Sequence, residues 1–216
     1  MCPSVEEGVA PTRQRLRFEG WIAGVGTSSG VRLVLGHWAR SPFGPFNDVM
    51  LEQANGRRLL LAPTAEIGDF IAGTYTFDEV QIVPVTVDVA GEAWSVTAPS
   101  LDLHFTTGRR DRLGALLHAV PGSLAIRPAW SALVDVPARL LLGVRTCSSN
   151  RADRREWYGV QDLLPISSAV AIFGGNDLGP LARVEPPVHF GAGSVPRKPA
   201  VVRLITTVGL ERGASL

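Results

Sequence analysis

Lysine is almost absent from this chain of 216 residues. Lys198 is the only lysine, and arginine supplies the rest of the 21 basic residues, which stand against 20 acidic residues at a net charge of +1. Domains that bind nucleic acid are usually strongly basic, so this balance argues against a nucleic-acid partner. Schiff-base catalysis requires a desolvated lysine. Lys198 lies in the Pro-rich segment 195–199, which we expect to be an exposed turn.

Cysteine is scarce as well. Cys2 and Cys147, far apart in the chain, define neither a disulfide framework nor a zinc site, and the four histidines lack a metal-ligand spacing. Residues 1–17 contain no apolar run of the kind found in signal peptides, and no run elsewhere is long enough to span a bilayer. We therefore expect a cytoplasmic protein with no membrane span, no metal and no cofactor.

The pattern that is present is mainly β. Apolar residues alternate with polar ones in segments 16–21 and 101–105, which is typical of half-buried strands. Ala54-Asn55-Gly56 separates two apolar runs and predicts a β-hairpin. Segment 66–72 fits one helical turn, and the helical spacing of apolar residues between 109 and 142 predicts two helices.

This order of elements favours an antiparallel sheet, because the regular alternation of strand and helix that parallel sheets require is missing. We expect a flexible tail over residues 1–15 and a single β-barrel-like domain over residues 16–216, with the two helices plugging or capping one end of the barrel. A two-sheet sandwich is the alternative architecture.

The most unusual segment is Ser41-Pro42-Phe43-Gly44-Pro45-Phe46-Asn47-Asp48-Val49-Met50-Leu51. It resembles the "S-P-x-G-P-Y-x-E-hydrophobic" strand of acetoacetate-decarboxylase-like β-barrel proteins, and segment 185–191 is similar to their late Pro-rich strand. The resemblance implies a cone-like barrel with a buried pocket for a small carboxylate or keto acid. The decarboxylases of that family use a central lysine as Schiff-base nucleophile. This chain has no lysine there, so the resemblance carries over the barrel and the pocket only.

Several polar residues in or near this segment are candidates for a site. Asp48 and Glu52 share one face of the expected strand, and they would be acid/base groups if that face lines a cavity. If Val49 and Leu51 alone face the core, both carboxylates are solvated. Arg40 and Arg32 are candidate anion anchors, because a guanidinium can grip a carboxylate with two hydrogen bonds. The aromatic ligand-binding candidates are Trp38, Phe43 and Phe46.

A second candidate constellation lies on the strand 101–105. Asp102 and His104 are two residues apart, so they lie on the same strand face, where the carboxylate could tune the imidazole as a base. In a barrel with a partly polar interior, His104 would be a catalytic candidate and Asp102 a ligand-binding one. The alternative is a solvent-facing polar pair opposite Leu101 and Leu103.

Three functions remain open at this point. The first is a barrel that binds an apolar or aromatic small molecule, with or without a carboxylate. The second is a lyase, cyclase or isomerase acting on a keto acid or polyketide-like compound. The third is a non-catalytic interaction module that docks through segment 130–142. A homo-oligomer is compatible with all three.

Overall fold

The computed structural model describes residues 14–111, 114, 115, 117, 147–151, 154–190 and 195–210. The elements, in chain order, are β1 (Gln14–Thr27), β2 (Arg32–Arg40), β3 (Phe46–Glu52), β4 (Arg58–Ala62), α1 (Ala65–Ala72), β5 (Glu79–Ile82), β6 (Thr86–Ala90), β7 (Ala93–Ala98), β8 (Leu101–Thr107), β9 (Cys147–Arg151), β10 (Arg154–Phe173), β11 (Asn176–Asp177), β12 (Leu181–Ala182) and β13 (Ala200–Leu210).

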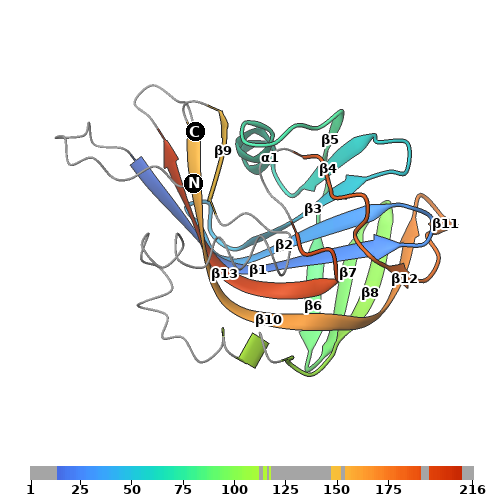
Figure 1. Ribbon diagram of the computed structural model, residues 1–216. Coiled ribbons are helices and arrows are strands. Elements are labelled where there is room, and N and C mark those ends of the chain that lie inside the picture. The colour runs from blue at the N-terminus through green and yellow to red at the C-terminus, as the bar shows by residue number, and fades with distance from the viewer. Residues whose placement is uncertain are drawn as a thin grey trace.

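The strands form one strongly curled sheet (Figure 1). Its main path runs β5-β4-β3-β2-β1-β13-β10-β8-β7-β6. Of the strand pairs described, β4 with β5 is parallel and the others are antiparallel. The prediction of a mainly β, largely antiparallel, barrel-like sheet is confirmed, in the form of a half-barrel. The path ends at β5 and β6, which residues 83–85 join in the chain.

The 20-residue strand β10 produces much of the curl, because it belongs to both halves of the sheet. Its first part pairs with β13 and its last part with β8, and register shifts lie between Val160 and Asp162 and between Ile166 and Ser168. Such irregularities bend a strand and increase its twist. The bend brings β7 and β8 back over β1–β3, where Trp94 packs against the rings of Trp21 and His37.

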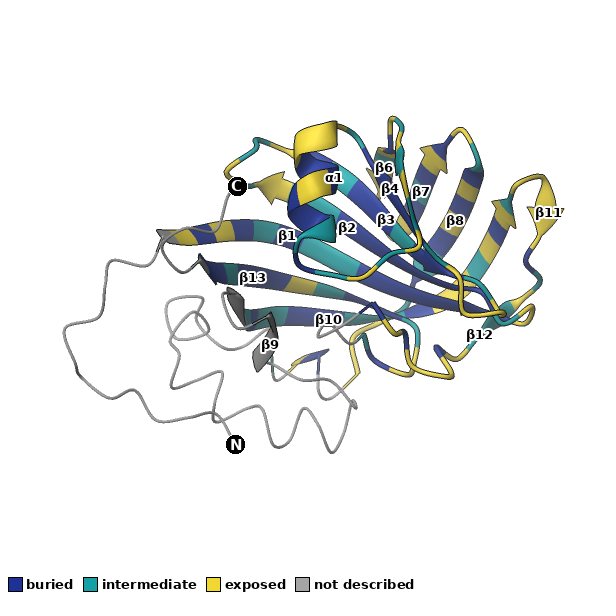
Figure 2. Ribbon diagram, turned by 90° about the horizontal axis from the view of Figure 1, so that it is seen from above, coloured by how far each residue is buried: buried dark blue, intermediate teal, exposed yellow. Residues whose placement is uncertain are grey.

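The sheet therefore has two buried faces over β1–β4. One face carries the main core, which includes Leu33, Leu35, Val49, Leu51, Val96, Leu103 and Phe105. The opposite face is covered by α1 and by residues 183–190, which we call the strap (Figure 2). Ile67, Phe70 and Ile71 of α1 are buried on this second face.

Short-range signals account for α1 and for the β3–β4 hairpin. Thr64 caps α1 by accepting a hydrogen bond from the Ile67 amide at 3.3 Å, and Phe70 and Ile71 give the helix its apolar face. The predicted hairpin at Ala54-Asn55-Gly56 is confirmed, with Gly56 at φ +86°. Both elements place side chains on the second buried face.

Two glycines of β1 allow the strap and its neighbours to approach the sheet closely. A Cβ atom at Gly26 would overlap the carbonyl oxygen of Arg183, and one at Gly24 would lie 2.9 Å from the Cβ of Val195. Glycine inside a strand often marks such an approach. Segment 24–30 is typical of a loop by sequence, yet β1 continues to Thr27 and only Ser28–Gly30 form the turn.

The two helices predicted between 109 and 142 fall largely outside the described residues. At the start of that range, the Gly114 amide donates to Asp111 Oδ1 at 2.8 Å and the Ala115 amide donates to the Asp111 carbonyl at 2.9 Å. Asp111 thus acts as a helix cap. In the described part of the chain, no helix has the length and apolar character needed to cross a membrane.

Candidate functional site

Strand β3 is buried on both faces, and this places two carboxylates inside the protein. Val49 and Leu51 face the main core, whereas Asp48 and Glu52 face α1 and the strap with relative exposures of 2% and 3%. The face that carries the carboxylates is covered because the aromatic and aliphatic side chains of α1 and the strap need an apolar surface to pack on.

A cavity of about 60 Å³ lies between α1 and the sheet. Its polar side chains are Asp48, Thr74, Tyr75, Tyr158 and Thr206. The rest of its wall is glycine, aliphatic and aromatic: Phe18, Ile22, Val34, Gly36, Trp38, Phe46, Met50, Phe70, Ile71 and Val208. An apolar cavity with a few converging polar groups is the usual form of a small-molecule site.

Asp48 is held in the cavity wall by its neighbours on β2. The Trp38 indole N–H donates to Asp48 Oδ1 at 2.9 Å. Gly36 lies directly opposite Asp48 in the sheet, and a Cβ atom there would overlap Asp48 Oδ1 and lie 2.5 Å from Trp38 Nε1. The absence of a side chain at Gly36 therefore makes room for the pair.

Burial changes the acidity of Asp48. Desolvation raises its pKa from 3.8 to about 7, and the hydrogen bond from Trp38, which stabilises the carboxylate, partly opposes this shift. Asp48 can consequently gain or lose a proton close to neutral pH. Groups with this property are common in functional sites.

Thr206 adds a second unusual polar group to the same wall. It lies on β13 between Phe18 of β1 and Tyr158 of β10. The residue is 5% exposed, and its hydroxyl oxygen has no hydrogen-bond partner among the described residues. Nearby, the hydroxyls of Tyr75 and Tyr158 are 3.2 Å apart. A buried polar atom without a partner lowers stability, so its presence calls for an explanation.

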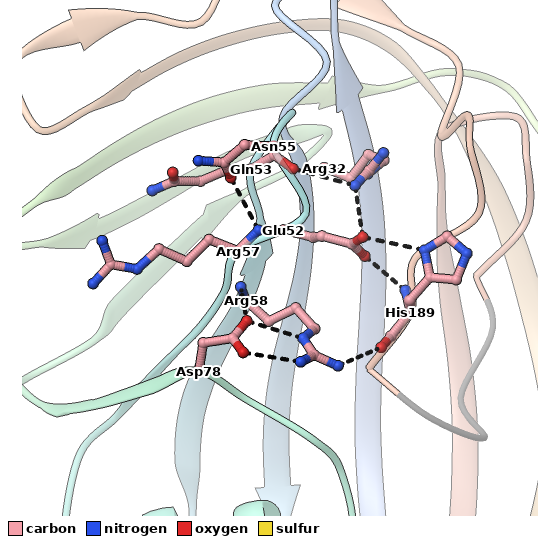
Figure 3. A network of polar contacts seen from close by, with 8 residues as sticks. All are labelled: Arg32, Glu52, Gln53, Asn55, Arg57, Arg58, Asp78 and His189. Atoms are coloured by element: carbon pink, nitrogen blue, oxygen red, sulfur yellow. Dashed lines mark hydrogen bonds and ion pairs between the residues drawn. The ribbon is translucent and has the colours of Figure 1, made fainter.

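A separate polar network surrounds Glu52 (Figure 3). Arg32 Nη2 lies 2.8 Å from Glu52 Oε1, and both side chains are 4% exposed. The His189 amide donates to Glu52 Oε2 at 2.6 Å, and His189 Nδ1 lies 3.1 Å from Oε1. Arg58, paired with Asp78, also donates to the His189 carbonyl at 3.4 Å. Glu52 therefore ties the strap to the sheet, with both carboxylate oxygens engaged.

The remaining candidate residues lie either on the surface or in the apolar cluster between α1 and the sheet. The Arg40 side chain is 82% exposed and lies 3.6 Å from Glu19. Phe43 packs its ring against Phe18 and Phe70. Asp102 and His104 lie on the outer face of β8, 2.9 Å apart, with side-chain exposures of 49% and 56%.

Of the nine residues proposed from sequence, the cavity brings together Trp38, Phe46 and Asp48. Lys198 is exposed and is not part of the cavity wall. The residues that sequence reasoning missed come from distant segments, and Thr206 is the clearest case. A usable signal was present there, because Thr206 is a polar residue at an inward position of the apolar strand β13.

Among the described residues, no cluster of three or more histidine, cysteine or acidic side chains is arranged to hold a metal ion.

Among the comparisons with known proteins, only the comparison with solved structures gives matches. No protein-family profile and no curated protein sequence matches this chain. An acetoacetate decarboxylase from Legionella pneumophila is similar, with 11% identity and a TM-score of 0.41 over 97% of this chain and 95% of that chain. A structure from studies of acetoacetate decarboxylase has 8% identity and a TM-score of 0.45 over 95% of this chain and 93% of that one.

A third similar structure is a putative AttH protein from Nitrosomonas europaea, with 9% identity, a TM-score of 0.29, and coverage of 97% of this chain and 58% of that chain. The family that segment 41–51 resembles thus also appears among the similar structures. Neither an activity nor a ligand follows from similarity at this level.

Proposed function

We propose that the protein binds a small molecule in the cavity between α1 and the sheet, with Asp48 as the polar anchor. The observation that carries this proposal is a buried carboxyl group and an unpartnered buried hydroxyl in one apolar wall of the described structure. Both groups lower the stability of the folded protein, and a ligand that hydrogen bonds to them would offset that cost.

The cavity size limits what can be enclosed. A cavity of about 150 Å³ accommodates benzene, and this cavity measures about 60 Å³. A ligand of a few non-hydrogen atoms, or the narrow end of a larger molecule, therefore fits. The aromatic side chains Phe18, Trp38, Phe46 and Phe70 would surround its apolar part.

A second candidate function is proton-transfer catalysis on a bound keto compound. It is favoured by the pKa of Asp48, which burial raises to about 7, the range in which a carboxyl group serves best as general acid or base at neutral pH. Catalysis through a lysine Schiff base has no support at this site, because Lys198 lies elsewhere.

Replacing Thr206 by valine tests whether the buried hydroxyl is kept for a ligand. Valine has the same shape without the unpartnered oxygen, so the free energy of unfolding should rise by about 1–2 kcal/mol in urea denaturation. The control Thr97→Val makes the same exchange at an exposed position of β7 and should change stability little. An unchanged or lower stability of Thr206→Val would mean that the hydroxyl already has a partner and needs no ligand.

The proposed binding itself can be tested with fragments of three to five non-hydrogen atoms, measured by saturation-transfer NMR on the full chain. Ile71→Phe adds volume on the cavity wall and should abolish the signals of fragments that bind the wild type. The control Ile82→Phe adds the same volume at a side chain that is 49% exposed and should leave those signals unchanged. Failure of every fragment to bind, or binding that Ile71→Phe does not reduce, would contradict the proposal.

A further inference from the structure

Two polar side chains of the cavity wall can accept hydrogen bonds from a ligand. Asp48 presents a carboxyl group whose Oδ1 atom accepts from the Trp38 indole N–H, which leaves Oδ2 to accept from a ligand. Thr206 presents a hydroxyl oxygen. The Trp38 indole N–H already donates to Asp48. A ligand that donates hydrogen bonds therefore complements Asp48, and the Thr206 hydroxyl can either accept from it or donate to it.

The electrostatic character of the wall points the same way. Asp48 is the sole acidic side chain among the lining residues described, and no arginine, lysine or histidine lies among them. The aromatic rings present negative faces that attract cations. An anionic ligand would meet a carboxyl group with no compensating cation, whereas a cationic ligand would meet both a carboxylate and aromatic rings.

The charged groups around Asp48 do not already neutralise it. Glu52 lies four residues along the same face of β3 and is paired with Arg32 of β2. From β10 and from the segment after α1, the titratable groups facing the cavity are the phenols of Tyr158 and Tyr75. The carboxylate of Asp48 is thus without a charged partner among the described residues.

We infer that the cavity takes a small organic amine in its protonated form, which donates its N–H groups to the Asp48 carboxylate and packs its hydrocarbon part against Trp38, Phe46 and Phe70. This inference rests on the proposed function and names the chemical class of its ligand. It requires Asp48 to be ionised when the amine binds, so affinity must increase as the pH rises through the pKa of Asp48, about 7.

Three probes of equal or similar size and different charge test the inference: n-propylamine, 1-propanol and propionate. Their affinities for the full chain would be measured by ligand-observed NMR titration at pH 8.5 and pH 5.5. At pH 8.5, n-propylamine should bind at least about tenfold more tightly than 1-propanol, and propionate should bind most weakly. At pH 5.5, the affinity for n-propylamine should be about 30-fold lower, because a group with a pKa of about 7 is then largely protonated.

The matched variants are Asp48→Asn and Asp102→Asn. The first would keep an oxygen that accepts from Trp38 but would remove the charge, so both the preference for the amine and its pH dependence should disappear. Asp102 is an exposed carboxylate on the outer face of β8, and its substitution should change neither. Thermal unfolding would establish that each variant is folded.

The outcomes separate this inference from the proposed function. Equal binding of 1-propanol and n-propylamine at pH 8.5, with both signals lost in Ile71→Phe, would overturn the amine inference and leave the cavity as a binding site. Stronger binding of propionate would overturn it as well. Binding of none of the three probes would also overturn it, and the fragment experiment with Ile71→Phe would then decide whether the cavity binds any ligand.

Discussion

Glu52→Gln should lower the free energy of unfolding by about 3–5 kcal/mol, the range expected when one partner of a buried ion pair is removed. The variant leaves the Arg32 guanidinium 4% exposed and without its carboxylate, and the Arg32 Nε atom already has no hydrogen-bond partner among the described residues. It also places an amide where the His189 backbone N–H now donates to a carboxylate oxygen. Urea denaturation at pH 7 would measure the loss.

Two controls distinguish this effect from a general loss of charge. Glu19→Gln removes a carboxylate that pairs with the exposed side chains of Arg17 and Arg40, and it should change stability little. The double substitution Arg32→Met with Glu52→Met removes both buried charges and should recover at least half of the loss. If Glu52→Gln were no more costly than Glu19→Gln, the carboxylate of Glu52 would not be holding Arg32 and the strap in place.

Asp48→Asn should raise the free energy of unfolding, and the size of the increase should depend on pH. The pKa of Asp48 in the folded protein, about 7, lies above its ordinary value of 3.8, so the folded state holds this proton more tightly than the unfolded chain does. Wild-type stability therefore decreases as the pH rises from about 4 to about 7, where the buried carboxyl becomes charged. Asparagine carries no such cost, so its advantage over aspartate should grow by about 4 kcal/mol between pH 4 and pH 8.

The measurement is urea denaturation of both proteins across that pH range, with Asp102→Asn as the control. Asp102 is half exposed on the outer face of the sheet, so its variant should follow the wild-type curve. A difference between Asp48→Asn and wild type that stays constant from pH 4 to pH 8 would mean that Asp48 is not desolvated in solution.

Local patterns in the sequence predicted much of the fold. Strand alternation at 16–21 and 101–105, the turn at Ala54-Asn55-Gly56 and the short helix near 66–72 all depend on neighbours in the chain. The curl of the sheet was only partly predictable, because it depends on the register shifts of β10 against β13 and β8. Such shifts arise from pairing between segments that lie far apart in sequence.

The candidate site shows the same limit. The two faces of β3 were correctly separated, but which face would be solvated depended on α1 and the strap, which cover Asp48 and Glu52. The sequence could not show that Glu52 holds the strap while Asp48 faces the cavity. Their environments do so, because Glu52 has Arg32 beside it whereas Asp48 has the indole of Trp38.

The position of β13 has a consequence for how the chain folds while it is being synthesised. This strand lies between β1 and β10 in the middle of the sheet, yet it spans residues 200–210, and Gln14 pairs with Leu210. Until residues 200–210 leave the ribosome, β1 and β10 each lack a partner along one edge, and unpaired edges favour aggregation. Pairing across such a separation also slows folding. We expect the nascent chain to depend on chaperones, with the wall that contains Thr206 among the last parts to form.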